Sequence, residues 1–347
     1  MLLDHSYRVP ETHWQAATSI LSEAHEPPKV NRDGFGDIRE YASPTFEPSR
    51  PSDDWGQTPS PGTPAGPVDL VESNDGTMMF LARMRIQVAG VSAALNKAGI
   101  IHKSQKANGS NHRIGGWNED GDDRLDLHNA LQKVSMADPG TSFGTNRSLD
   151  QFDVNTKPTD SIPLTASEAS ALLHYVPSKH LDSPRSDIND ERDDIEDAGL
   201  VLKLDEIEHL LADSFWSFSS NPVRAARNLN KRGMSDDDRR ALMEALKRYD
   251  RAVSADSVRV SVQTIHAAKG GEAEHVVVYD GVSNRILESI HEPDSFKNEM
   301  RVWYVALTRS SDIIHLMRGA FAPMGHSAII PPDIRETVQQ RVAGDSQ

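Results

Sequence analysis

The regular spacing of hydrophobic residues is clearest towards the C-terminal end of the chain. Valine recurs at every second position from 258 to 262, and the apolar run EHVVVYD follows at 274–280. The first pattern predicts a strand with one buried face, and the second predicts a strand buried on both faces. Residues 293–310 have the spacing of an amphipathic helix, and DIIHLM at 312–317 predicts one more strand.

A strand and a helix are predicted together nearer the N-terminus. TMMFLA at 77–82 reads as a short buried strand, and apolar residues at helical spacing follow at 85–100, where Gly99 is a stop signal. A strand followed directly by an amphipathic helix is half of a βαβ unit. A further helix is predicted at 9–25. Both ends of the chain therefore favour an α/β fold with a parallel sheet flanked by helices.

The middle of the chain has a different pattern. Residues 161–250 read as mostly helical, but 183–197 is so dense in charge that we expect a solvated connection there. Pro, Ser and Gly predict a disordered loop at about 43–70. We expect a sheet domain in two parts with a small helical insert between them. The expected boundaries are 1–134 and 254–325 for the sheet domain, 135–253 for the insert, and 326–347 for a flexible tail.

The composition narrows the class of protein. The chain has 37 Lys+Arg and 52 Asp+Glu, a net charge of −15, so contact with nucleic acid requires a local basic patch. It has no cysteine, which excludes disulfides, cysteine-ligated zinc and thiol nucleophiles. No apolar run approaches the roughly 20 residues that span a bilayer, and the N-terminus does not resemble a signal peptide. We expect a soluble cytoplasmic protein.

One short connection carries an unusual amount of polar chemistry. TIHAAKGGEAEHVVVYDG at 264–281 places Thr, His, Lys, two glycines and Glu between two predicted strands. Glycine lets the backbone approach a ligand closely, a carboxylate can accept bonds from a sugar hydroxyl, and Thr, His and Lys can contact phosphate. Taken alone, the stretch is more typical of an ordinary polar turn.

A second motif changes that interpretation. TIHAAKG-x-E at 264–272 and YVALTR at 304–309 together resemble the last two motifs of UvrD/Rep-type DNA helicases of superfamily 1. LLDHSYRVP at 2–10 resembles the motif that opens the second RecA-like domain of that family, and 77–100 is similar to the block that follows it. More loosely, the chain resembles compact archaeal members. The resemblance implies a RecA-like sheet domain interrupted by a reduced helical subdomain.

The resemblance implies a nucleotide site. Tyr7 matches the residue that stacks on adenine, and Glu272 matches the residue that binds the ribose, with Gly270 giving close backbone access. Arg8 and Arg309 match the two arginines that reach the γ-phosphate of ATP, and a guanidinium there stabilises the transferring phosphoryl group. The resemblance therefore implies ATP with Mg²⁺ as the cofactor.

The resemblance also implies a DNA track. Thr264 and His266 match positions on the single-stranded DNA side, and Arg83 lies in a block whose counterparts line the DNA channel. The role of Lys269 is left open. The loop at 264–272 would then lie between nucleotide and DNA and couple the state of the nucleotide to the grip on the strand.

Part of the expected machinery is missing from this sequence. No phosphate-binding loop G-x-x-x-x-G-K-[ST] occurs in the 347 residues. We therefore expect the C-terminal portion of an ATP-dependent 3′–5′ helicase, inactive alone, acting on single-stranded or partly duplex DNA. The phosphate loop and most of the magnesium ligands would come from a partner chain or a missing N-terminal half. The alternative is a non-catalytic DNA-binding or regulatory remnant, which the replacement of the usual Leu by Gly271 favours.

Two further features have open interpretations. Trp117, in the GGWN stretch, can stack on a base or anchor a loop. The basic segment NPVRAARNLNKRG at 221–233 can contact DNA phosphates or form a solvated face.

Overall fold

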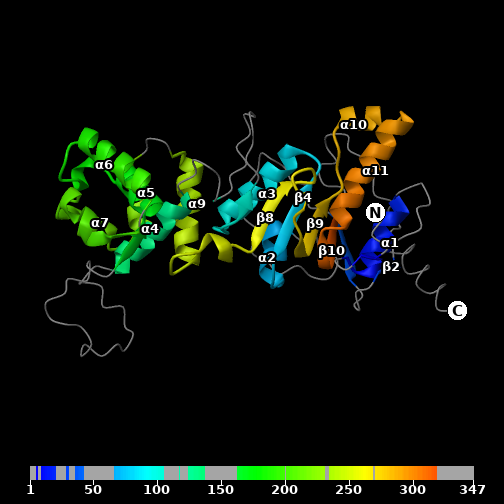
Figure 1. Ribbon diagram of the computed structural model, residues 1–347, viewed down its shortest axis with the longest axis horizontal. Helices are drawn as coiled ribbons and strands as arrows, with labels where there is room; N and C mark the ends of the chain where they lie inside the picture. Colours follow the sequence, from blue (N-terminus) through cyan, green and yellow to red (C-terminus); the bar gives the residue numbers. More distant parts are fainter. Residues whose placement is uncertain are drawn as a thin grey trace, which may run out of the picture. The chain divides into compact units, whose positions relative to one another are not determined.

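The chain forms two compact units, which are described separately (Figure 1). The computed structural model describes residues 5–6, 9–20, 29–30, 36–42, 66–104, 117, 124–136, 162–199, 201–230, 234–268 and 270–318. The sheet unit is drawn from 1–95, 102–116 and 259–347, and the helical unit from 96–101 and 117–258.

A six-stranded sheet forms the centre of the sheet unit. Every neighbouring pair of its strands is parallel. The order across the sheet is β3 (Asp37–Ala42), β10 (Ser310–Arg318), β9 (Ala273–Tyr279), β4 (Met78–Ala82), β8 (Val260–Thr264) and β5 (Lys103–Ser104). A parallel sheet with flanking helices confirms the predicted α/β RecA-like fold. A separate parallel pair joins β1 (His5–Ser6) to β2 (Lys29–Val30).

Helices α1 (Glu11–Ile20) and α11 (Pro293–Leu307) contact each other and share a core with one face of the sheet (Figure 1). Alternate residues of the central strands point into this core, as the two-residue period of a strand requires. Trp303 is fully buried there. The strand residues of this core include Met79, Leu81, Val276, Val278, Ile314 and Leu316.

The other helices of the sheet unit are α2 (Pro67–Ser73), α3 (Arg85–Lys97) and α10 (Asn284–Ser289). The last two residues of α3 are assigned to the helical unit. The predicted loop at about 43–70 is wrong at its end, because α2 begins at Pro67. Proline suits the first helical position, and the Asp69 carboxylate accepts a bond from the Gly66 backbone N–H at 3.0 Å. The rest of that prediction, up to residue 65, lies outside the described residues.

The helical unit has a core of its own. Its helices are α4 (Arg124–Met136), α5 (Ala166–Tyr175), α6 (Arg185–Ala198), α7 (Ser214–Ser219), α8 (Pro222–Arg227) and α9 (Asp236–Arg248). A small antiparallel pair joins β6 (Pro163–Thr165) to β7 (Val201–Lys203). The side chains that fill the core include Leu127, Leu131, Leu172, Leu173 and Leu242. Helix α4, which the sequence placed in the sheet domain, packs against α5, α8 and α9 of this unit.

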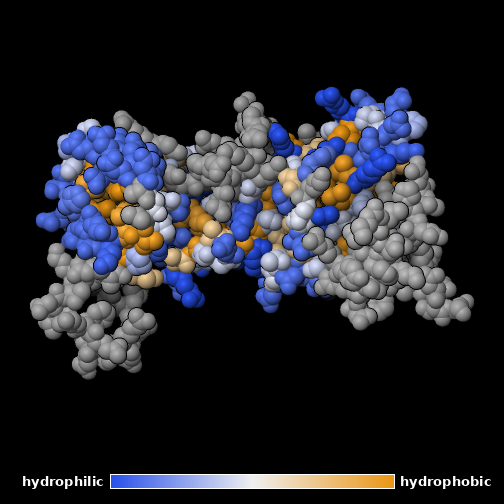
Figure 2. Space-filling model, viewed as in Figure 1, coloured by the Kyte–Doolittle hydropathy of each residue, from blue (hydrophilic) through white to orange (hydrophobic). Residues whose placement is uncertain are grey.

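Helix α6 corrects the prediction of a solvated connection at 183–197. It buries Ile188 and Ile195, which lie two turns apart on one face, and it ends at Gly199, whose φ of 60° is left-handed. The exposed positions are mostly acidic, and Figure 2 shows a hydrophilic surface where α6 lies. Two apolar residues were too few to reveal a helical period in the sequence.

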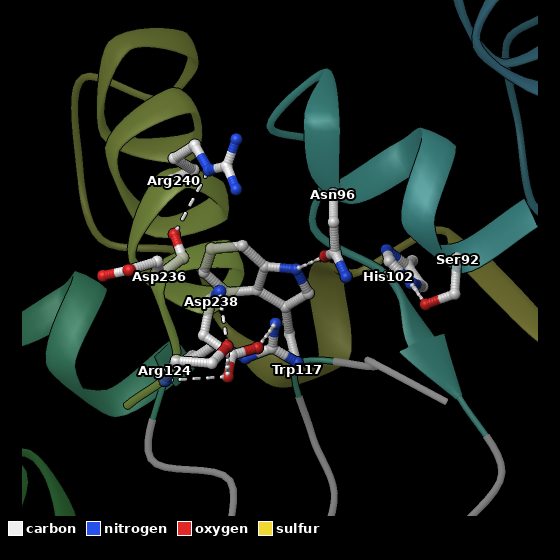
Figure 3. A network of polar contacts seen from close by, with 9 residues as sticks. Ser92, Asn96, His102, Trp117, Arg124, Asp236, Asp238 and Arg240 are labelled. Carbon is white, nitrogen blue, oxygen red and sulfur yellow. Dashed lines mark hydrogen bonds and ion pairs between the residues drawn. The ribbon is translucent and has the colours of Figure 1, made fainter. Parts of the chain in front are cut away.

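Trp117 is a core residue of the helical unit (Figure 3). Its indole N–H donates to the Asn96 side chain at 2.8 Å, and the Arg124 guanidinium lies 5.3 Å from the ring centre. Arg124 also pairs with Asp238 of α9 at 3.1 Å. Because the side chain is fully buried, neither face of the ring is open to a nucleic-acid base, and the stacking interpretation is wrong for this conformation.

Candidate functional site

The polar connection at 264–272 crosses the sheet. Strands β8 and β9 are parallel, and β4 lies between them. Residues 265–272 therefore lead from the carboxyl end of β8 to the amino end of β9. Ile265 and Ala268 anchor the connection in the core that α1 and α11 cover, and the backbone N–H groups of Ala267 and Ala268 donate to the Thr264 carbonyl. The two ends of the loop thus lie at opposite ends of the parallel strands. We call these the carboxyl edge, where β8 ends, and the amino edge, where β9 begins.

The predicted DNA-contacting residues gather at the carboxyl edge. Arg83 follows the last residue of β4, and that residue, Ala82, is paired with Thr264 at the end of β8. His266 lies in the turn that begins there and is exposed. The Arg83 guanidinium holds Glu299 of α11 through two bonds, from Nε to Oε1 at 2.8 Å and from Nη2 to Oε2 at 3.0 Å.

Charge at this edge acts on His266. Partial burial of the imidazole lowers its pKa most, the positive charge of Arg83 lowers it further, and the carboxylate of Glu299 raises it. The three side chains therefore form one electrostatic group, with each ionised partner acting on the imidazole.

The nucleotide residues predicted from TIHAAKG-x-E and YVALTR meet at the amino edge. Ser310 at the start of β10 is paired with Ala273 at the start of β9. The Arg309 guanidinium donates from Nη1 to the Gly271 carbonyl at 3.2 Å and from Nε to the Val305 carbonyl at 3.1 Å. The Ala273 backbone N–H donates to the Arg309 carbonyl at 3.1 Å. Arg309 therefore lies against the loop between Gly270 and Glu272.

The loop leaves its backbone accessible beside Arg309. Gly270 has a φ of 90°, a left-handed conformation that favours glycine, and a Cβ placed there would meet nothing within 4 Å. Glu272 is exposed. An open backbone, a carboxylate and a guanidinium at one edge are groups that fit a nucleotide.

Other site residues are not placed by the structure. Tyr7, Arg8 and Lys269 lie outside the described residues. The proximity of Arg8 to Arg309 therefore stays a prediction. The described residues also contain no group of three or more acidic or histidine side chains that could hold a metal ion, so no magnesium site is assigned to this part of the chain.

Gly271 lies against a methionine. A Cβ placed on Gly271 would be 3.2 Å from the terminal methyl carbon of Met79, and Met79 is buried in the core of the sheet unit. In the sequence, the replacement of the usual Leu by Gly271 favoured the non-catalytic alternative. Met79 fills the adjoining space from the neighbouring strand, so Gly271 alone does not indicate relaxed packing.

Glu299 is the site residue that sequence reasoning missed. It lies on the apolar face of α11, one turn before Trp303, and it is 6 % exposed. A carboxylate on the buried face of an amphipathic helix requires a cationic partner. That signal was present in the sequence, but it did not identify Arg83 as the partner.

The comparison with protein families fits this geometry. Residues 221–316 match the model of the UvrD-like helicase C-terminal domain. The match supports a UvrD-like helicase C-terminal domain over this stretch. It contains the crossing loop, α11 and Arg309, and it confirms the prediction made from the two motifs. A comparison with curated proteins found no match. In the part of the chain that is described, no helix combines the length and apolar character needed to cross a membrane.

Proposed function

We propose that the sheet unit is the second RecA-like domain of an ATP-dependent DNA helicase of the UvrD type. The observation that carries the proposal is the bond from Arg309 to the Gly271 carbonyl. It brings the arginine of one motif to the glycines and Glu272 of the other, at an edge that a nucleotide could occupy.

At that edge, Arg309 supplies positive charge to the γ-phosphate, together with Arg8, and Glu272 binds the ribose. Tyr7 stacks on the adenine. A guanidinium in this role stabilises the charge that develops on the transferring phosphoryl group. ATP brings Mg²⁺, which lowers the charge on the phosphates and would be held mainly by the phosphate-loop domain that these 347 residues do not contain.

At the opposite edge, Arg83, Thr264 and His266 contact a single DNA strand. Arg83 supplies charge to the phosphates, and Thr264 and His266 supply short polar contacts. The loop at 265–272 connects the two edges directly. A displacement of Arg309 therefore changes how tightly the residues at the carboxyl edge bind the DNA strand. We assign 3′ to 5′ polarity, action on single-stranded or partly duplex DNA, and cytoplasmic location with the same proposal.

Hydrolysis requires a phosphate loop, which the 347 residues lack. We propose that another segment or chain supplies it and that this chain alone does not turn over ATP. The same absence favours the second candidate, a DNA-binding or regulatory remnant without turnover.

The test co-expresses the chain with any phosphate-loop domain found encoded next to its gene and measures DNA-stimulated ATP hydrolysis. We expect hydrolysis only in the combination, and we expect Arg309→Ala to lower kcat by roughly 10³-fold, as for an arginine that stabilises phosphoryl transfer. Arg301→Ala is the matched control, because Arg301 is exposed on α11, which ends two residues before Arg309.

The outcomes separate the two candidates. Hydrolysis by the chain alone, or an Arg309→Ala variant as fast as the wild type, overturns the enzymatic proposal. Strand binding without hydrolysis in the combination favours the remnant.

A further inference from the structure

Glu299 is a buried carboxylate that the proposed function does not use. Its side chain is 7 % exposed and that of Arg83 is 21 % exposed. The pair is bidentate, with both carboxylate oxygens accepting from the guanidinium at 2.8 and 3.0 Å. Removing one partner of such a pair leaves a buried charge, so the two side chains are strongly coupled.

The bonds to Glu299 use the part of Arg83 that a phosphate would use. A guanidinium grips a carboxylate and a phosphate with the same planar fork of N–H groups. Nε and Nη2 form one edge of that fork, and both donate to Glu299. A strand phosphate that binds this edge must therefore displace the carboxylate.

We propose that Glu299 is a positioning residue that holds Arg83 through a reversible ion pair, which we call the latch. A DNA phosphate that binds Arg83 displaces the Glu299 carboxylate and so opens the latch. This inference rests on the proposed function, because it takes the carboxyl edge as the DNA track. The latch weakens resting strand affinity and makes it dependent on the position of α11.

Helix α11 links the latch to the nucleotide edge. Glu299 lies eight residues before Leu307, the end of α11, which is about 12 Å along a helix axis. Arg309 lies two residues beyond this end, and its guanidinium Nε donates to the Val305 carbonyl in the last turn. A displacement of α11 that accompanies phosphate contact at Arg309 therefore moves the carboxylate that holds Arg83.

The test measures binding of a fluorescently labelled oligothymidylate to the full chain over a range of salt concentrations. Glu299→Gln keeps the shape and removes the charge, so we expect roughly fivefold tighter binding. The slope of log K against log[salt] should steepen by about 0.7, because one more phosphate is neutralised. The double variant Arg83→Gln/Glu299→Gln should not show the tighter binding of Glu299→Gln. It also leaves no unpaired buried charge.

A matched control separates the latch from a general loss of negative charge. Asp294→Asn removes the same charge from an exposed position on α11. We expect it to change affinity less than Glu299→Gln and to leave the salt slope unchanged. Thermal unfolding of each variant shows whether it is folded under the binding conditions.

Each result has a distinct meaning. If Glu299→Gln binds no tighter than Asp294→Asn while the wild type binds the strand, the latch is overturned and the proposed function stands. If the double variant keeps the full gain, Arg83 is not the group released, and the latch is again overturned. If no folded variant binds single-stranded DNA, both the latch and the proposed DNA track are overturned.

Discussion

Gly271 and Met79 share one space between the crossing loop and β4. The Met79 methyl carbon lies 3.2 Å from the position of a Gly271 Cβ, which is closer than ordinary van der Waals contact. Methionine is unbranched and adapts to irregular gaps, so it can fill space that a side chain from the loop would otherwise take. A larger residue at 271 and a smaller one at 79 should therefore compensate each other.

We predict that Gly271→Leu destabilises the chain by about 1–3 kcal/mol through overpacking and that Met79→Ala does so by about 2–5 kcal/mol by opening a cavity. The double variant should be more stable than the sum of the two changes implies, because leucine fills the space that methionine vacates. Urea unfolding of the four proteins measures this coupling. Additive losses would show that the two residues do not share a space.

At the residue scale, the site residues that belong to a motif were predicted from the sequence. Pairs of residues that meet from distant parts of the chain were not. Gly270, Glu272 and Arg309 were predicted from the resemblance of two motifs to those of UvrD/Rep-type helicases, and the structure brings them to one edge. Glu299 and Met79 were not predicted because their roles depend on partners far away in the chain. Glu299 pairs with Arg83, and Met79 lies against Gly271. Sequence periodicity reports the burial of a position but not the identity of the group that meets it.

At the scale of elements, three aromatic side chains form a hydrogen-bonded row across β3, β10 and β9. The Tyr41 hydroxyl lies 3.2 Å from His315 Nδ1, and His315 Nε2 lies 3.3 Å from His275 Nδ1. The pKa of His315 is lowered to about 3, mostly by burial and in addition by His275 and Arg39, while Asp37 acts in the opposite direction. His315 is therefore neutral in the folded chain near pH 7 and also at pH 5.

This row makes stability depend on pH. Below about pH 6.5 the unfolded chain protonates His315 and the folded chain does not, so the unfolded state binds more protons and stability falls as pH falls. From pH 7 to pH 5 the loss is about 2 kcal/mol, since each pKa unit corresponds to 1.36 kcal/mol. The fall continues until the pH approaches the folded pKa.

We predict that His315→Leu loses about 2 kcal/mol less stability than the wild type between pH 7 and pH 5, although it is less stable than the wild type at pH 7. Urea unfolding at both pH values measures the difference. Leu316→Ala, a core change on the same strand, is the control, and it should keep the wild-type pH dependence. A His315→Leu variant with the same pH dependence as the wild type would show that this histidine does not titrate as described.

Elements were predicted where their apolar residues are dense. Strands β4, β8, β9 and β10 and helix α11 each carry several apolar residues at a regular period. Helix α6 carries two buried isoleucines among acidic residues, and α2 follows a proline-rich stretch, so neither stood out from its surroundings. Their caps and their packing decide the conformation there, against a local composition that favours a loop.

At the scale of the whole molecule, the described residues form two separate hydrophobic cores. One core joins the sheet to α1 and α11, and the other joins the helices of the helical unit; the two share no residue. A domain with its own buried core can unfold as its own cooperative unit. The sequence indicated a helical insert, but α4 lies in that unit because its long-range contacts are with α5, α8 and α9.

We predict that a cavity in one core lowers the stability of that unit alone. Leu172 and Leu316 are both fully buried, one in each core, so Leu172→Ala and Leu316→Ala are matched changes that should each cost about 2–5 kcal/mol. Fluorotryptophan NMR during urea unfolding reports the units separately, because Trp117 lies in the helical core and Trp303 in the sheet core. Leu172→Ala should move the Trp117 transition to lower urea and leave that of Trp303 in place, and Leu316→Ala should do the reverse. Transitions that move together in either variant would mean that the two cores unfold as one cooperative unit, and the independence inferred from their separate packing would be wrong.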